Sequence, residues 1–268
     1  LAATATNPEG EPAADGALPV SPATLTVPAG GTAEATVTLE TGAVAGVGHF
    51  SGAVTATAEN GTRHATPLAF YLEPERYDVH IEGIARDGRP AYGTVQVLDV
   101  EDGSVAAVRT WGDGTGDSCT TEVWDMSSCI RLEPGTYSVS GIVLTMPPGR
   151  SSTAPPTTAE RQLNTSLLVE PELTVTGETT VTLDARDAVE VEFETPGHPT
   201  RQVTGSAAQV SLSRVAETGE TISHGLLIGP RDQVEPRWFV QPTDQVDHGE
   251  LTAYSQVTLD APDITFRV

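Results

Sequence analysis

Two cysteines, Cys119 and Cys129, have the most clearly defined chemistry in this sequence. Two thiols with no further cysteine or histidine close by in the sequence cannot complete a tetrahedral zinc site, and they do not have the Cys-x-x-Cys spacing of redox centres. We therefore predict a local disulfide, which contributes on the order of 2–3 kcal/mol in the chain-entropy account. A persistent disulfide implies an oxidising compartment, so we expect the chain to be exported and extracellular.

Three aspartates near the cysteines are candidate calcium ligands, because hard cations take several oxygen ligands: Asp113, Asp117 and Asp125. Their spacing lacks the ligand ladder and the terminal glutamate of an EF-hand loop. Acidic, glycine-rich turns are also the usual composition of hairpin tips. We keep calcium as a secondary alternative and otherwise predict no metal and no cofactor.

Two tryptophans are candidate ligand contacts: Trp111 precedes the cysteine loop and Trp124 lies within it. Exposed tryptophan can hold sugars or peptides by stacking and apolar contact. A tryptophan in a small β domain can equally belong to the core, and the sequence leaves both interpretations open.

No pattern of residues predicts a catalytic site. The chain has no Gly-x-Ser-x-Gly segment, no His-Glu-x-x-His and no phosphate-binding glycine loop. Six histidines are scattered singly, and we expect each to be an exposed polar residue: His49, His64, His80, His198, His224 and His248. We therefore predict no catalytic residues in this chain. A hydrolase site built from acids distant in sequence stays open as a third alternative.

Charge and hydropathy exclude several classes of partner. The 268 residues include 37 acidic and 14 basic residues, the basic ones all arginine, for a net charge of −23. Such a charge repels phosphate backbones, so we expect no nucleic-acid partner. No run approaches the ~18 apolar residues of a membrane helix, so we expect no membrane insertion. The first residues lack a methionine or a signal pattern, and we expect an internal piece of a longer precursor.

Strand patterns recur along the whole chain. Residues 32–39 alternate small or apolar with polar side chains, which predicts a strand. Residues 48–58 predict a second strand, which leads into a hairpin turn at Asn60-Gly61. Tyr77, Val79 and Ile81 begin a second set of alternating strands. These patterns predict an all-β chain of three small antiparallel β-sandwich domains in series, over residues 1–73, 74–186 and 187–268.

Several of these segments resemble a known family. Residues 21–32 read SPATLTVPAGGT and residues 48–52 read GHFSG. They resemble the fibronectin type III-like domain that follows the catalytic domain in secreted subtilisin-like serine proteases of actinomycetes. Residues 132–139, LEPGTYSV, look like the turn of transthyretin-like regulatory sandwiches, and residues 181–186, VTLDAR, resemble the C-terminal extension of such proteases. The catalytic motifs of that family are missing here.

The resemblance implies a noncatalytic accessory region of an exported serine peptidase, which supports substrate or partner binding, stability or maturation. The expected partners are the catalytic domain of the parent enzyme or a protein substrate. The alternative is an independent cell-surface or polysaccharide-binding module.

Overall fold

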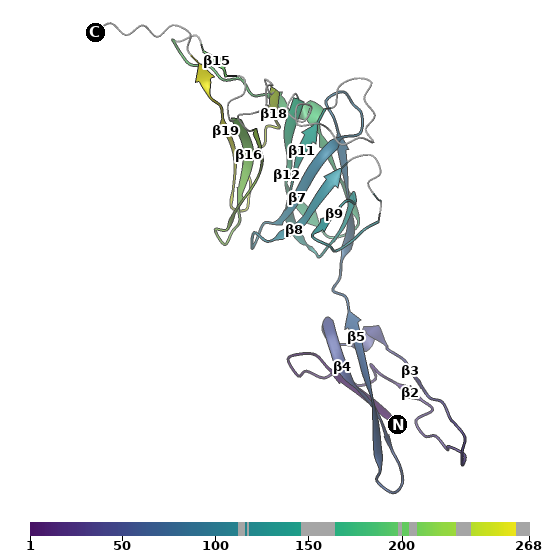
Figure 1. Ribbon diagram of the computed structural model, residues 1–268. Helices are drawn as coiled ribbons and strands as arrows, with labels where there is room; N and C mark the ends of the chain where they lie inside the picture. Colours follow the sequence, from purple (N-terminus) through teal and green to yellow (C-terminus); the bar gives the residue numbers. More distant parts are fainter. Residues whose placement is uncertain are drawn as a thin grey trace. The chain divides into compact units, whose positions relative to one another are not determined.

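The computed structural model describes residues 1–111, 116, 118–145, 164–197, 200–203, 208–228 and 237–260. These residues are strands and connecting segments, with two single 3-10 turns, η1 (Thr41–Ala43) and η2 (Ala185–Asp187). No helix in this part of the chain could span a membrane. The all-β prediction is confirmed. The chain divides into two compact units, Leu1–Glu75 and Arg76–Val268, and each is described by itself (Figure 1).

The first unit consists of a three-stranded antiparallel sheet and a short ribbon. The sheet has the order β1-β4-β5, formed by β1 (Ala2–Thr6), β4 (Gly48–Thr57) and β5 (Arg63–Leu72). The ribbon joins β2 (Val20–Ser21) to β3 (Thr36–Val37).

A hairpin joins β4 and β5 at Asn60-Gly61 as predicted, but residues 58–62 connect the strands instead of the two residues of the shortest Asn-Gly turn. Gly61 has a φ of +83°, a conformation that a residue without Cβ adopts at little cost. The side chain of Asn60 accepts a hydrogen bond from the backbone of Thr62 at 3.0 Å. Phe50 and Phe70 are paired across the two strands and stack with ring centroids 5.0 Å apart.

The alternating segment 32–39 differs from its prediction. Only Thr36–Val37 forms a strand, and Ala33 and Ala35 are exposed rather than in a core. The partner strand is two residues long and is followed by Pro22, which has no N–H to donate to a ladder. Burying an alanine methyl also yields little hydrophobic free energy, so the pattern has little to hold it in a sheet.

The second unit contains a seven-stranded central sheet in the order β14-β18-β12-β11-β7-β8-β9. Its strands are β7 (Tyr92–Asp99), β8 (Val105–Trp111), β9 (Trp124–Asp125), β11 (Gly135–Leu144), β12 (Asn164–Val175), β14 (Val189–Glu190) and β18 (Arg237–Val240). A three-stranded sheet, β10-β6-β13, covers one face, formed by β6 (Tyr77–Ile84), β10 (Cys129–Leu132) and β13 (Thr179–Asp184). Val79 and Ile81 of β6 are buried in the core between these two layers, as their alternation predicts.

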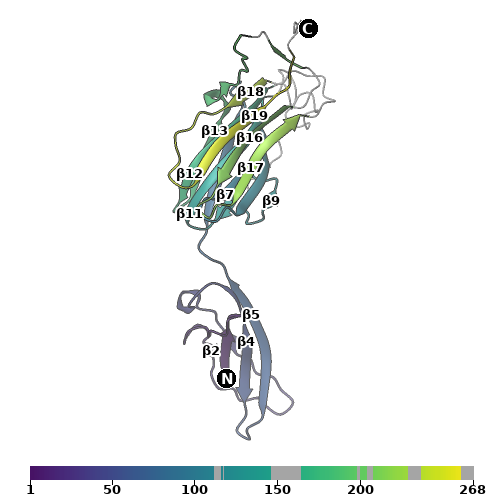
Figure 2. The same cartoon turned by 90° about the vertical axis from the view of Figure 1, so that its left-hand side faces the viewer.

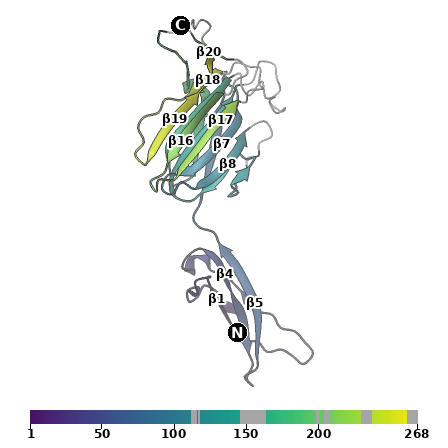
Figure 3. The ribbon, with the colours of Figure 1, turned by 60° about the vertical axis from the view of Figure 1, so that its left-hand side comes forward.

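A third sheet covers the opposite face of the central one (Figures 2 and 3). Its order is β17-β16-β19, formed by β16 (Ala208–Val215), β17 (Thr221–Ile228) and β19 (Glu250–Gln256). A further pair, β15 (Arg201–Gln202) and β20 (Leu259–Asp260), is separate from it.

Strand β11 has both faces buried as a consequence. Val139 and Val143 belong to the first core, and Ile142 and Leu144 to the second, where they pack with Leu212 of β16. The middle layer of the second unit is thus buried on both sides.

The domain borders differ in part from those predicted. The first border, after residue 73, lies two residues from the end of the first unit. The second, after residue 186, falls inside the second unit, since β18 pairs with β12 in the central sheet. We find two units rather than three, and the sheets are mixed: β12 with β18, β6 with β13 and β8 with β9 run parallel. The alternation of a strand shows that it has a buried face, but not which sheet it joins.

Candidate functional site

The predicted disulfide between Cys119 and Cys129 is confirmed and closes a loop at one edge of the central sheet. The loop carries β9, the last strand of that sheet. Hydrogen bonds hold the loop as well: Arg131 N–H donates to the carbonyl of Thr120 at 3.0 Å, and Ser127 Oγ donates to the carbonyl of Ser118.

A buried arginine is hydrogen-bonded to the backbone of this loop. Arg109 of β8 is 1% exposed, and its Nη1 donates to the carbonyl of Val123 at 2.8 Å. Burial lowers the pKa of Arg109, although Asp125 and Glu122 favour its charged form. Sequence reasoning missed this residue; a charged side chain within an apolar strand pattern, AAVRTW, was the available signal.

The outside of the loop presents apolar side chains to solvent. Trp124 is 76% exposed and Met126 is 64% exposed, and Val123 is also exposed. Trp124 is therefore not a core residue. We call Val123, Trp124 and Met126 the loop surface.

A pocket of about 370 Å³ begins beside the loop surface, because Val123 and Thr121 line it. Charged groups line it too: Arg76, which pairs with Glu133 at 2.6 Å, and Arg131. The exposed apolar side chains of the loop surface therefore lie next to a pocket that charged groups line.

Tyr137 also lines the pocket, and its hydroxyl donates to the carbonyl of Glu133 at 3.0 Å. Burial, with smaller contributions from Asp99 and Glu133, raises the pKa of Tyr137 to about 12. The phenol is therefore neutral at physiological pH.

The other predicted site residues lie apart from this arrangement or outside the described residues. Trp111 ends β8 opposite Gly93, and its side chain is outside the described part of the chain. Asp113 and Asp117 also lie outside the described residues. Asp125 is exposed on β9, and its carboxylate accepts a hydrogen bond from Met126 N–H at 2.7 Å.

The histidines do not all fit the expectation of exposed polar residues. His49 on β4 and His64 on β5 do, and His198 lies outside the described residues. His80 is brought to the disulfide, with Nε2 3.8 Å from Cys129 Sγ. Sequence spacing gave no signal of this contact, because 49 residues separate the two.

His224 lies between the central and third sheets. Ser140 Oγ is 2.8 Å from its Nδ1, and Thr94 Oγ1 is 3.3 Å from its Nε2. Burial lowers the pKa of His224 to about 4, opposed in part by a backbone hydrogen bond involving Ser140. Both ring nitrogens have a hydroxyl partner and Ser140 is buried, so this pair serves interlayer packing.

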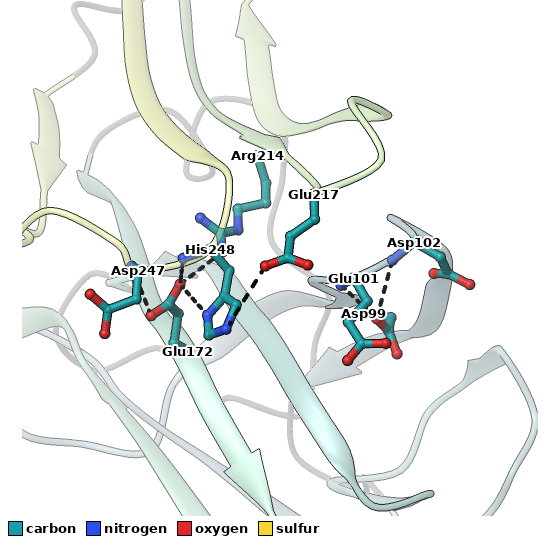
Figure 4. A network of polar contacts seen from close by, with 8 residues as sticks. All are labelled: Asp99, Glu101, Asp102, Glu172, Arg214, Glu217, Asp247 and His248. Atoms are coloured by element: carbon teal, nitrogen blue, oxygen red, sulfur yellow. Dashed lines mark hydrogen bonds and ion pairs between the residues drawn. The ribbon is translucent and has the colours of Figure 1, made fainter.

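Glu172 of β12 lies at the centre of a polar network in the second unit (Figure 4). Its carboxylate accepts backbone N–H groups of Asp247 and His248 at 3.0 and 2.7 Å, and it pairs with Arg214 at 3.2 Å and with His248 Nδ1 at 3.2 Å. Burial raises the pKa of Glu172, but these hydrogen bonds outweigh it and the net pKa is lowered. The network connects the central sheet to the third sheet.

The comparisons with known proteins give no family. A scan against protein-family models and a search of curated proteins find no match. Among solved structures, a search finds "Structure of the Streptococcal ancillary pilin", 11% identical over 80% of this chain and 72% of that chain, with a TM-score of 0.21. Similarity at that level carries no argument about fold or function.

Proposed function

We propose that this chain is a noncatalytic, extracellular binding region that contacts protein substrates through the loop surface. The observation that carries this proposal is the 76% exposure of Trp124 on a loop closed by a disulfide. That the chain belongs to a larger enzyme, a secreted subtilisin-like serine peptidase, is proposed from the sequence resemblance alone.

Rigidity makes the loop surface suited to binding. The disulfide and Arg109 restrain the loop backbone before any ligand arrives. Binding to a restrained loop loses less conformational entropy than binding to a free one. Tryptophan is also one of the three residue types, with tyrosine and arginine, that are enriched among the residues contributing most to interface free energies.

Charge indicates the kind of peptide that fits. The chain carries a net charge of −23, and Glu122 and Asp125 are exposed beside Trp124. Complementary charge accelerates encounter and selects among partners. We therefore propose unfolded protein segments with both apolar and basic side chains as the ligands.

A polysaccharide is the second candidate ligand, and the exposed indole of Trp124 favours it. An aromatic ring facing solvent can stack on the apolar face of a sugar. The same variant tests both ligands.

The variant Trp124→Ala is expected to weaken binding of an unfolded basic protein, reduced and S-alkylated lysozyme, on the order of tenfold or more, since a central aromatic contact is worth about 2 kcal/mol. Biolayer interferometry with this protein immobilised measures the change directly, and a glycan array measures the polysaccharide alternative. Leu227→Ala is the matched control, because Leu227 is 67% exposed on β17 of the third sheet. Equal binding by the two variants, or no binding of either ligand class, would contradict the proposal.

Sequencing the reading frame upstream of Leu1 tests whether the chain belongs to such a peptidase. The resemblance predicts that this frame encodes a subtilisin-like catalytic domain with aspartate, histidine and serine motifs. An upstream frame without them would remove the peptidase from the proposal but leave the binding test in force.

A further inference from the structure

Two sulfur atoms and an imidazole nitrogen lie together where the loop residue Cys119 meets His80 of β6 and Cys129 of β10. The possible ligand atoms of His80, Cys119 and Cys129 are all within 4.8 Å of one another. Cys129 is buried, whereas His80 and Cys119 are partly exposed, so the cluster can be reached from solvent. While the disulfide is intact, its sulfurs are not thiolate ligands.

We propose that, when this disulfide is reduced, Cys119, Cys129 and His80 bind one Zn²⁺ ion. A trialkylphosphine is a sufficient reductant: phosphorus takes oxygen from one water, and the water's two protons and phosphorus's two electrons convert the disulfide into two thiols. Binding then releases the two thiol protons to solvent and leaves two thiolates and a neutral imidazole on the metal. Water takes the fourth position.

The backbone places these ligands independently of the disulfide. His80 and Cys129 are directly paired across β6 and β10. Thr120 and Ile130, which follow the two cysteines, form a bridge of their own. Reduction therefore leaves the two thiols facing each other, next to the imidazole.

The separations suit a tetrahedral site after a small movement. Zinc bonds of about 2.3 Å to sulfur and about 2.0 Å to nitrogen put neighbouring ligand atoms roughly 3.5–3.8 Å apart. The distance between His80 Nε2 and Cys129 Sγ is already 3.8 Å. The two sulfurs must part by roughly 2 Å from their bonded distance, which cysteine side-chain rotation can supply.

Donor type determines which metal fits. Two thiolates and an imidazole suit zinc, whereas calcium takes oxygen ligands. This site is therefore distinct from the calcium alternative considered for Asp113, Asp117 and Asp125. The ion would replace the disulfide as the restraint on the loop that carries Trp124.

Cobalt titration of the phosphine-reduced full chain, with reductant removed without air, tests this site. We expect one Co²⁺ per chain, with thiolate-to-cobalt charge-transfer and tetrahedral d–d absorption that added Zn²⁺ abolishes. The oxidised chain is expected to show neither band. His80→Gln is expected to weaken Co²⁺ binding by at least about tenfold, and His64→Gln, on the exposed strand β5, is the matched control.

Absence of the bands in the reduced chain would overturn the proposal, and so would an unchanged Co²⁺ affinity in His80→Gln. Circular dichroism during the same titration shows whether the reduced chain has lost its β structure. In that case the proposal requires the metal to restore the β spectrum, and failure to restore it counts against the site equally. The variant Cys119→Ser with Cys129→Ser must show no thiolate bands.

Discussion

Replacing Glu172 by glutamine is expected to lower the free energy of unfolding of the second unit by about 3 kcal/mol. Arg214, its partner at 3.2 Å, is only 4% exposed. The Nε and Nη1 atoms of Arg214 have no hydrogen-bond partner among the described residues. The variant therefore leaves a buried guanidinium without its carboxylate, which costs more than the loss of one surface ion pair.

Denaturant unfolding followed by tryptophan fluorescence measures this loss. All three tryptophans belong to the second unit, so the signal reports that unit alone. Asp247→Asn is the matched control, because only the backbone of Asp247 contacts Glu172. A double variant, Glu172→Leu with Arg214→Met, is expected to lose less than the sum of its single variants. A loss in Glu172→Gln no larger than in Asp247→Asn would show that the network does not hold the third sheet.

Acidification from pH 7 to pH 4 is expected to destabilise the second unit through His224. Its pKa is about 4 in the folded chain against 6.5 for the free side chain, so the unfolded chain binds the proton first. The stabilisation is complete above about pH 6.5, falls as the pH drops and levels off below about pH 4. At about 1.4 kcal/mol for each pH unit in that window, the loss reaches about 3 kcal/mol.

The variant His224→Gln is expected to remove this pH dependence. Glutamine does not titrate, so its free energy of unfolding should stay nearly constant between pH 6.5 and pH 4.5, whatever the variant's stability at pH 7. Glu172 does not add to the pH dependence in this range. Because its pKa is lowered in the folded chain, its contribution to the free energy of unfolding is lost only below about pH 4.5. Urea unfolding at half-unit pH intervals makes the comparison. An equal slope in wild type and variant would mean that His224 accepts a proton as readily folded as unfolded.

Local patterns were sufficient for part of this structure. The alternation in Tyr77, Val79 and Ile81 predicted a strand with one buried face, because neighbouring side chains in a strand point to opposite sides. The Asn60-Gly61 dipeptide predicted its hairpin, because glycine accepts positive φ. These features depend on residues close together in the sequence.

Other local patterns failed or left alternatives open. Residues 32–39 alternate, yet Ala33 and Ala35 are exposed, because alternation without bulky apolar side chains provides little burial free energy. Trp124 could have been a core residue or a surface contact. Its exposure depends on whether another part of the chain packs over it, and the residues next to Trp124 in the sequence do not encode that.

The sequence by itself determined the strand content, the acidic surface and the pairing of the chain's two cysteines. Only the tertiary structure decided that β12 and β18 share one sheet, that His224 lies between layers and that His80 lies beside Cys129. The physical reason is sequence separation. A strand's composition encodes its own buried face, whereas its partner is selected by the packing of the whole chain, so contacts across 49 or more residues leave no local pattern.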